Sequence, residues 1–156
     1  MNATGTPVQV QQAESPDPQQ KLPDEDRPYL PDSKLTPGSI FQEATRQEIC
    51  VPGYAKRVRH VPPGVKTFVY RSYGIRRHRP GEYEVDHLIS LELGGDNNPT
   101  NLWPEPYQGP WNAHTKDRLE NELHWRVCNG SMPLAEAQKE ISSDWGATYR
   151  KYLGTP

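Results

Sequence analysis

Cysteines and long apolar runs are scarce in this chain of 156 residues. The two cysteines, Cys50 and Cys128, form no Cys-x-x-Cys pair, so neither a disulfide-rich scaffold nor a structural zinc is expected. A single bridge would close a loop of 128 − 50 = 78 residues and would indicate an oxidising compartment. Two buried free thiols are the alternative, and the sequence leaves both open.

No run approaches the roughly 18 apolar residues of a membrane span, so no span is expected. Residues 1–10 also lack the basic and apolar regions of a signal peptide. The compartment therefore stays open: a cytoplasmic protein and the mature form of a secreted or periplasmic one are both compatible with the sequence. The oligomeric state is open as well.

Charge is divided unevenly along the chain. The net charge is −2, but residues 1–40 hold six acidic and three basic residues, a net of −3, which leaves +1 for residues 41–156. Residues 56–79 contain eight lysines and arginines and no acid. This concentration is typical of polyanion binding, with a solvated basic hairpin as the alternative. The residues that we expect to contact a phosphate backbone here are Arg71, Arg76, Arg77 and Arg79.

Proline divides the chain into a tail and a domain. Residues 1–39 are rich in Pro, Gln, Asp and Ser and hold few apolar residues, which predicts a disordered tail. Residues 40–154 are predicted to form one domain. Within it, the β-branched and aromatic residues of 66–73 and 83–89 predict strands. A turn rich in Gly and Asn follows, and then a brief strand at 101–103 that Pro104 and Pro106 should stop.

The periodicity changes from strand-like to helical after this point. From Trp111 to Val127 an apolar or small residue recurs every fourth position, and a similar stripe runs from Leu134 to Tyr149. Asn129-Gly130 should end the first helix, and Pro133 suits the first turn of the second. The prediction is an α+β fold with a basic N-terminal β segment and a C-terminal helical pair.

The chemistry-bearing residues lie where these elements meet. Asp86-His87 ends the first predicted strand of the core, Asn101 opens the second, and Asn112 precedes the helix. A histidine can deprotonate water near neutral pH, and carboxylate and amide oxygens suit Mg²⁺ or Mn²⁺. We therefore expect His87 to be a general base, Asp86 and Asn112 to hold a metal, and Asn101 to fix the His87 loop by hydrogen bonds.

This arrangement resembles the HNH branch of the His-Me finger (ββα-metal) nucleases. The Asp-His, Asn and Asn spacing is similar to that of the HNH domain in RNA-guided CRISPR nucleases. The segments Glu-Val-Asp-His-Leu-Ile-Ser-Leu-Glu-Leu-Gly-Gly, Asn-Leu-Trp-Pro-Glu-Pro and Lys-Asp-Arg-Leu-Glu also resemble small stand-alone bacterial HNH-like proteins. The resemblance implies a ββα-metal core at about 83–127.

The resemblance implies a metal-dependent endonuclease that hydrolyses phosphodiester bonds of DNA, with RNA as a further substrate to consider. It assigns His87 as the base and Asn101 as the residue that orients the histidine loop. One divalent ion, Mg²⁺ first and Mn²⁺ or another as alternatives, would lie on Asp86 and on Asn112 or, alternatively, His114. Lys116 would contact phosphate. The alternative is a catalytically inactive module of the same fold that binds nucleic acid or acts as a secreted interaction protein.

Overall fold

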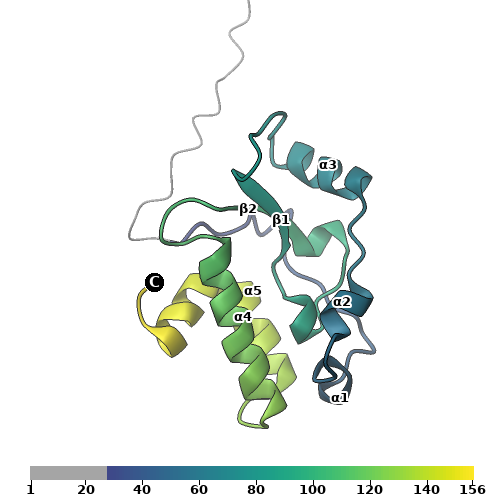
Figure 1. Ribbon diagram of the computed structural model, residues 1–156, viewed down its shortest axis with the longest axis vertical. Coiled ribbons are helices and arrows are strands. Elements are labelled where there is room, and N and C mark those ends of the chain that lie inside the picture. The colour runs from purple at the N-terminus through teal and green to yellow at the C-terminus, as the bar shows by residue number, and fades with distance from the viewer. Residues whose placement is uncertain (1–27) are drawn as a thin grey trace, which may run out of the picture.

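The computed structural model describes residues 28–156, and its elements form an α+β fold (Figure 1). Five helices surround a small antiparallel hairpin within the described residues. The elements are α1 (Arg46–Ile49), α2 (Tyr54–Val58), α3 (Pro63–Ser72), β1 (Tyr83–His87), β2 (Leu102–Pro106), α4 (Ala113–Cys128) and α5 (Leu134–Leu153), with short 3-10 turns η1 (Leu91–Leu93) and η2 (Pro99–Asn101).

The hairpin places the Asp-His pair at the end of β1. Asp86 pairs with Trp103 and His87 with Leu102 in the antiparallel register. Contrary to the prediction, β2 continues through Pro104 and Pro106. The N–H of Leu88 donates to the Asn101 carbonyl, and the N–H of Tyr107 donates to the Glu82 carbonyl. The backbone N–H and C=O groups of the odd-numbered residues of β2 therefore point toward β1. The prolines therefore occupy positions whose missing N–H would have pointed away from the ladder.

The predicted basic β segment is wrong, because residues 63–72 form helix α3. Pro63 occupies the first turn, where its missing N–H costs nothing. The β-branched residues that suggested a strand are accommodated: Val69 is buried, and the Thr67 hydroxyl donates to the Pro63 carbonyl one turn earlier. Strand propensity reflects packing on a sheet more than an intrinsic backbone preference, and this segment packs against both strands of the hairpin as a helix.

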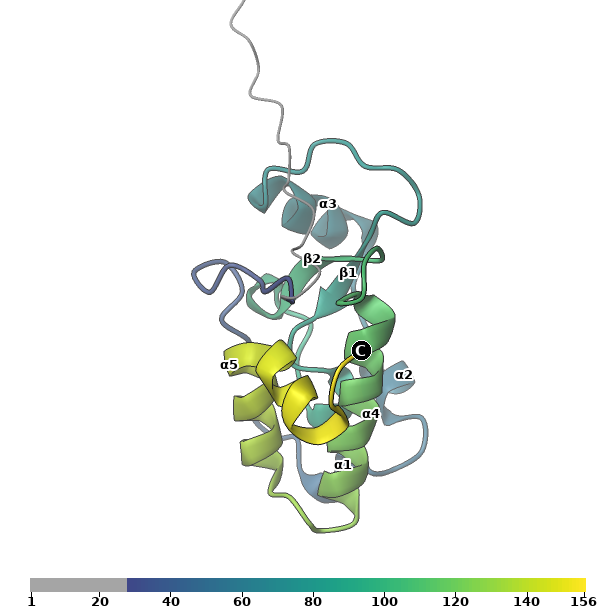
Figure 2. The same cartoon turned by 90° about the vertical axis from the view of Figure 1, so that its left-hand side faces the viewer.

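The C-terminal helical pair is confirmed. In Figures 1 and 2, α4 and α5 run side by side below the hairpin. The stripe of α4 is buried throughout, and so are four of the five positions of the α5 stripe. Their shared core is closed by Trp111, whose ring meets those of Trp145 and Tyr149 edge to face. No helix among residues 28–156 is long and apolar enough to cross a membrane.

Residues before the predicted domain boundary at residue 40 already pack on the domain. Tyr29 stacks on Trp103, and its carbonyl accepts a hydrogen bond from the indole of Trp145 (3.0 Å). Thr36 is also buried and donates to the Leu102 carbonyl (2.9 Å). Residues 28–39 therefore pack on the hairpin and α5, whereas the rest of the predicted tail, residues 1–27, lies outside the described residues.

The structure contains the Cys50–Cys128 disulfide. It joins the end of α1 to the last turn of α4, with the two Cα atoms 5.7 Å apart. Of the two states that the sequence left open, the bridged one is therefore present.

Candidate active site

A pocket of about 500 Å³ opens between α3, the hairpin and α4. Both members of the Asp-His pair line it, although neighbouring strand residues normally point to opposite faces. This is possible because β1 ends at His87 and the chain turns there. The other lining residues come from α3, β1, η1, α4 and the segments that connect them: Arg59, Lys66, Tyr70, Tyr83, Glu84, Val85, Ser90, Leu91, Tyr107, Asp117 and Glu120.

The ring of His87 is buried and held in one tautomer. Its Nε2 lies 3.1 Å from Oδ1 of Asn97, an atom that also accepts the backbone N–H of His60 (3.0 Å). Nδ2 of Asn97 in turn donates to the Val58 carbonyl (2.8 Å), which fixes the amide orientation. Oδ1 is thus an acceptor, so Nε2 carries the proton and Nδ1 keeps the lone pair. The sequence analysis missed Asn97, because this residue lies in a segment rich in Gly and Asn that was interpreted only as a turn.

The electrostatic surroundings keep His87 neutral. Burial lowers the pKa of His87 below its ordinary value of 6.5, and the nearby positive charges of Arg59 and Lys116 act in the same direction. The hydrogen bond to Asn97 and the Asp86 charge oppose this shift without reversing it. A buried, neutral imidazole with one free lone pair is suited to accept a proton from water at neutral pH.

Asn101 holds the loop that follows His87, as predicted for it. Its Oδ1 accepts the N–H of Ile89 (2.9 Å), and its Nδ2 donates to the carbonyls of Ile89 (3.0 Å) and Asp96 (2.9 Å). Gly95 allows this close approach, because a Cβ there would lie 1.7 Å from the Ile89 carbonyl oxygen. Asn101 is fully buried, so it acts on the loop backbone, while Asn97 acts on the imidazole ring.

Lys116 lies in the interior and not on a phosphate-binding surface. Its ammonium group is fully buried and donates to Oδ2 of Asp86 (2.9 Å), to the His87 carbonyl (2.7 Å) and to Oε1 of Glu120. All three ammonium protons are therefore used within the protein. The expected phosphate contact is not available in this arrangement, and Lys116 instead links α4 to the end of β1.

Three carboxylates gather beside this lysine. Oxygen atoms of Glu84, Asp86 and Glu105 all lie within 4.8 Å of one another. Glu105 is fully buried, yet neither of its oxygens accepts a hydrogen bond from any N–H or O–H group of the described residues. An ionised carboxylate in that position is costly unless a proton or a cation satisfies it. The hard oxygen donors of this group fit a divalent ion such as Mg²⁺ or Mn²⁺.

The pKa values of the acidic residues follow from burial and from Lys116. Burial acts to raise the pKa of Asp86, but the Lys116 charge and hydrogen bonding outweigh it, so the pKa is lowered and Asp86 is ionised. Burial raises the pKa of Glu105 well above its ordinary value, and the facing Asp86 charge adds to this. Burial, together with the Asp86 charge, raises the pKa of Glu120 to about 8, although Lys116 opposes the shift.

Neither of the two alternatives for the second metal ligand, Asn112 or His114, is among the residues that line the pocket. Asn112 is the N-cap of α4: its Oδ1 accepts the N–H of Thr115 (3.0 Å) and its Nδ2 donates to the Gly109 carbonyl (2.8 Å). His114 is exposed, with Nδ1 3.8 Å from a carboxylate oxygen of Asp117. The structure thus brings Glu84 and Glu105 to Asp86, where the sequence analysis expected Asn112 or His114.

The basic residues divide into two groups. Arg59 and Lys66 line the pocket, although the sequence analysis did not single them out. The predicted phosphate contacts are exposed on α3 and on the 74–82 loop, which packs on α3 through stacking of His78 on Tyr70. These predicted contacts are Arg71, Arg76, Arg77 and Arg79. None of the four takes part in an ion pair with another described residue.

In comparisons with known proteins, no family model, no curated protein and no solved structure matches this chain.

Proposed function

We propose that this protein is a metal-dependent endonuclease of the ββα-metal type, acting on DNA and with RNA as a further substrate to test. Its core would be β1, β2 and α4, with Lys116 fastening the helix to the strand end. The observation that carries the proposal is His87: a buried imidazole, neutral and fixed in one tautomer, beside a group of carboxylates that fits a divalent ion.

The charge of the pocket supports a metal-dependent reaction. The pocket wall holds Asp86, Glu84 and Asp117, and Glu105 lies behind them. Such a wall repels a phosphodiester, and a bound divalent cation would reverse that repulsion. When bound, the ion would supply charge stabilisation for the phosphate and the leaving 3′ oxygen.

The ligand set that we propose is Asp86 with Glu84 and Glu105. Tyr107 supports it, because its hydroxyl donates to Oε2 of Glu84 and so orients that carboxylate. His87 would take a proton from the attacking water at Nδ1, while Asn97 retains the proton on Nε2. Arg59 and Lys66 at the pocket, and the arginines of α3 and the 74–82 loop, would hold the nucleic-acid backbone.

The decisive experiment is plasmid cleavage with Mg²⁺, with Mn²⁺ and with EDTA, using the wild type and His87→Ala. Cleavage should require the metal and fall by about 10²–10⁴-fold in the variant, the usual contribution of a general base. His60→Ala is the matched control, because His60 is exposed and contributes only its backbone N–H to the site. Equal cleavage by both variants would refute the role of His87.

The ligand set has its own test, independent of cleavage. Tyr83 and Tyr107 line the pocket and should sensitise luminescence of a bound Tb³⁺ ion, which Mg²⁺ or Mn²⁺ would displace. Glu105→Gln should weaken this binding by about tenfold or more, since it removes a charged ligand. Glu136→Gln, at an exposed position of α5, should leave it unchanged. Unchanged binding in Glu105→Gln would remove Glu105 from the set.

Lys116 favours a second candidate, a nucleic-acid-binding module without cleavage. Its ammonium lies 2.9 Å from Oδ2 of Asp86 and would compete with a metal for that carboxylate. This candidate predicts salt-dependent DNA binding with no cutting under any metal.

The Cys50–Cys128 disulfide supports a further proposal, that the protein works in an oxidising compartment such as the periplasm or the extracellular space.

A further inference from the structure

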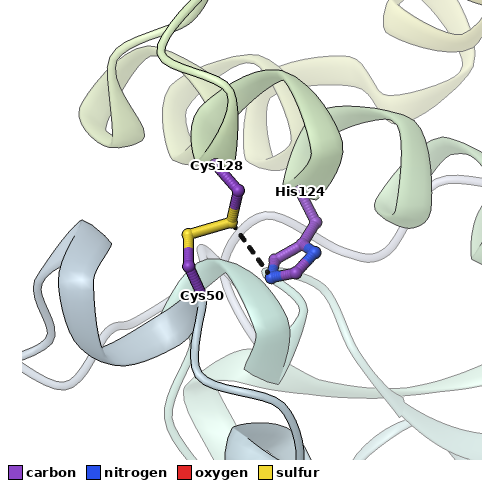
Figure 3. Close-up of side chains that lie close together, drawn as sticks. All are labelled: Cys50, His124 and Cys128. Atoms are coloured by element: carbon purple, nitrogen blue, oxygen red, sulfur yellow. Dashed lines mark hydrogen bonds between the residues drawn. A yellow bond between two sulfur atoms is a disulfide. The ribbon is translucent and has the colours of Figure 1, made fainter.

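A second group of metal-ligating side chains lies on the opposite end of α4 from the pocket. Cys50, His124 and Cys128 present their sulfur and nitrogen atoms within 4.8 Å of one another. In Figure 3 the His124 ring lies alongside the disulfide, with Nε2 3.4 Å from the sulfur of Cys128. His124 and Cys128 are four residues apart on the helix and so share one face. All three are half-buried, which leaves an open side toward solvent.

We infer that reduction of the Cys50–Cys128 disulfide converts this group into a Zn²⁺ site formed by two thiolates and the His124 imidazole. A dithiol or phosphine reductant would supply two electrons to the S–S bond. The two thiols would then each release a proton on binding the metal. Two thiolates and a neutral imidazole balance the charge of Zn²⁺, and water can complete the tetrahedron. The inference does not depend on the proposed nuclease function.

The distances fit this conversion without movement of the backbone. Zn–S and Zn–N bonds of about 2.3 and 2.0 Å place tetrahedral ligand atoms roughly 3.5–3.8 Å apart. The His124 nitrogen is already at 3.4 Å from Cys128, so the two sulfurs need only separate from bonding distance. Their Cα atoms, 5.7 Å apart, allow this by rotation of the side chains alone.

Contacts other than the disulfide keep the three residues in place after reduction. Arg46, on α1, donates from Nε to the Val127 carbonyl (2.8 Å) and from Nη2 to the Cys128 carbonyl (2.9 Å). His124 Nε2 lies 3.1 Å from the Ile49 carbonyl, and zinc would replace the proton that Nε2 donates there, with the imidazole proton then on Nδ1. The two Arg46 bonds join α1 to the last turn of α4 independently of the sulfur atoms and of the imidazole, so the reduced ligands remain close together.

The test is a titration of the full chain with Co²⁺, a spectroscopic substitute for Zn²⁺, before and after reduction with a phosphine under anaerobic conditions. The reduced protein should show thiolate-to-cobalt charge transfer and the intense visible bands of tetrahedral Co²⁺, and Zn²⁺ should displace both. The oxidised protein should show neither. Any Co²⁺ on the carboxylates of the pocket would give no thiolate band and would bind in both states.

His124→Gln separates the proposed site from simple binding to two thiols. It should lower the affinity of the reduced protein for Co²⁺ by about tenfold or more and change the visible spectrum, whereas His60→Gln should do neither. If the reduced metal-free protein unfolds, the inference requires Zn²⁺ to restore its helicity, and circular dichroism measures this. A His124→Gln protein with the affinity and spectrum of the wild type would overturn the inference, as would a reduced protein that Zn²⁺ neither binds nor refolds.

Discussion

Replacing Lys116 by methionine should destabilise the protein strongly. The lysine is fully buried, and its ammonium contacts two carboxylates, Asp86 and Glu120, besides the His87 carbonyl. Methionine preserves most of the side-chain volume, so the main loss is the charge. Removing one partner of a buried ion pair leaves an uncompensated charge and costs about 3–5 kcal/mol. For a chain of this size that loss corresponds to a melting temperature lower by about 10 °C or more.

Urea unfolding followed by tryptophan fluorescence measures this effect directly. Lys139→Met is the matched control, because Lys139 is exposed on α5, and its free energy of unfolding should change by less than about 0.5 kcal/mol. The double variant Lys116→Met/Asp86→Asn should regain part of the stability, since the ionised carboxylate that needs a positive partner is then removed. If Lys116→Met is as stable as Lys139→Met, or the second substitution restores nothing, the buried network does not have the role assigned to it.

Three further results are expected. The cleavage rate should fall at acid pH with a midpoint below the ordinary histidine pKa of 6.5, because burial lowers the pKa of His87 and protonation removes its free lone pair; a midpoint above 6.5 would contradict this. Asn97→Ala should reduce cleavage by about tenfold, less than His87→Ala, by releasing the ring tautomer, and unchanged single-turnover rates would argue against it. The double variant Cys50→Ser/Cys128→Ser should lose about 4 kcal/mol of stability, the loop-closure estimate for 78 residues, and reductant should destabilise only the wild type in thermal melts.

Local signals were sufficient for the two C-terminal helices and for the loop that follows His87. Apolar residues that recur every three or four positions over four turns are typical of one face of an amphipathic helix, and this predicted α4 and α5 together with their core faces. The dipeptide Asp86-His87 before a turn, with Asn101 beyond it, likewise indicated a strand end held by an asparagine. These features depend on residues near one another in the chain, so their spacing carries the information.

The same local reasoning failed where long-range packing decides the outcome. The residues of α3 have strand-forming side chains, but the segment begins with Pro63 in its first turn and packs against both strands of the hairpin as a helix. Asn112 has an amide oxygen of the kind that can bind a metal, but that oxygen caps the first turn of α4. Lys116 is typical of an exposed phosphate contact, but two oxygen atoms from the end of β1 and one from the next turn of α4 hold it inside.

The sequence by itself determined the two long helices, the position of the hairpin and the places of His87 and Asn101 beside its strand ends, because these follow from periodicity and short-range spacing. Only the tertiary structure decided that Glu84 and Glu105 join Asp86 and that Cys50 meets Cys128 beside His124. These groups assemble from residues up to 78 positions apart. Such contacts form when the apolar faces of the helices pack together, and the side chains that they bring into contact cannot be read from neighbours in the chain.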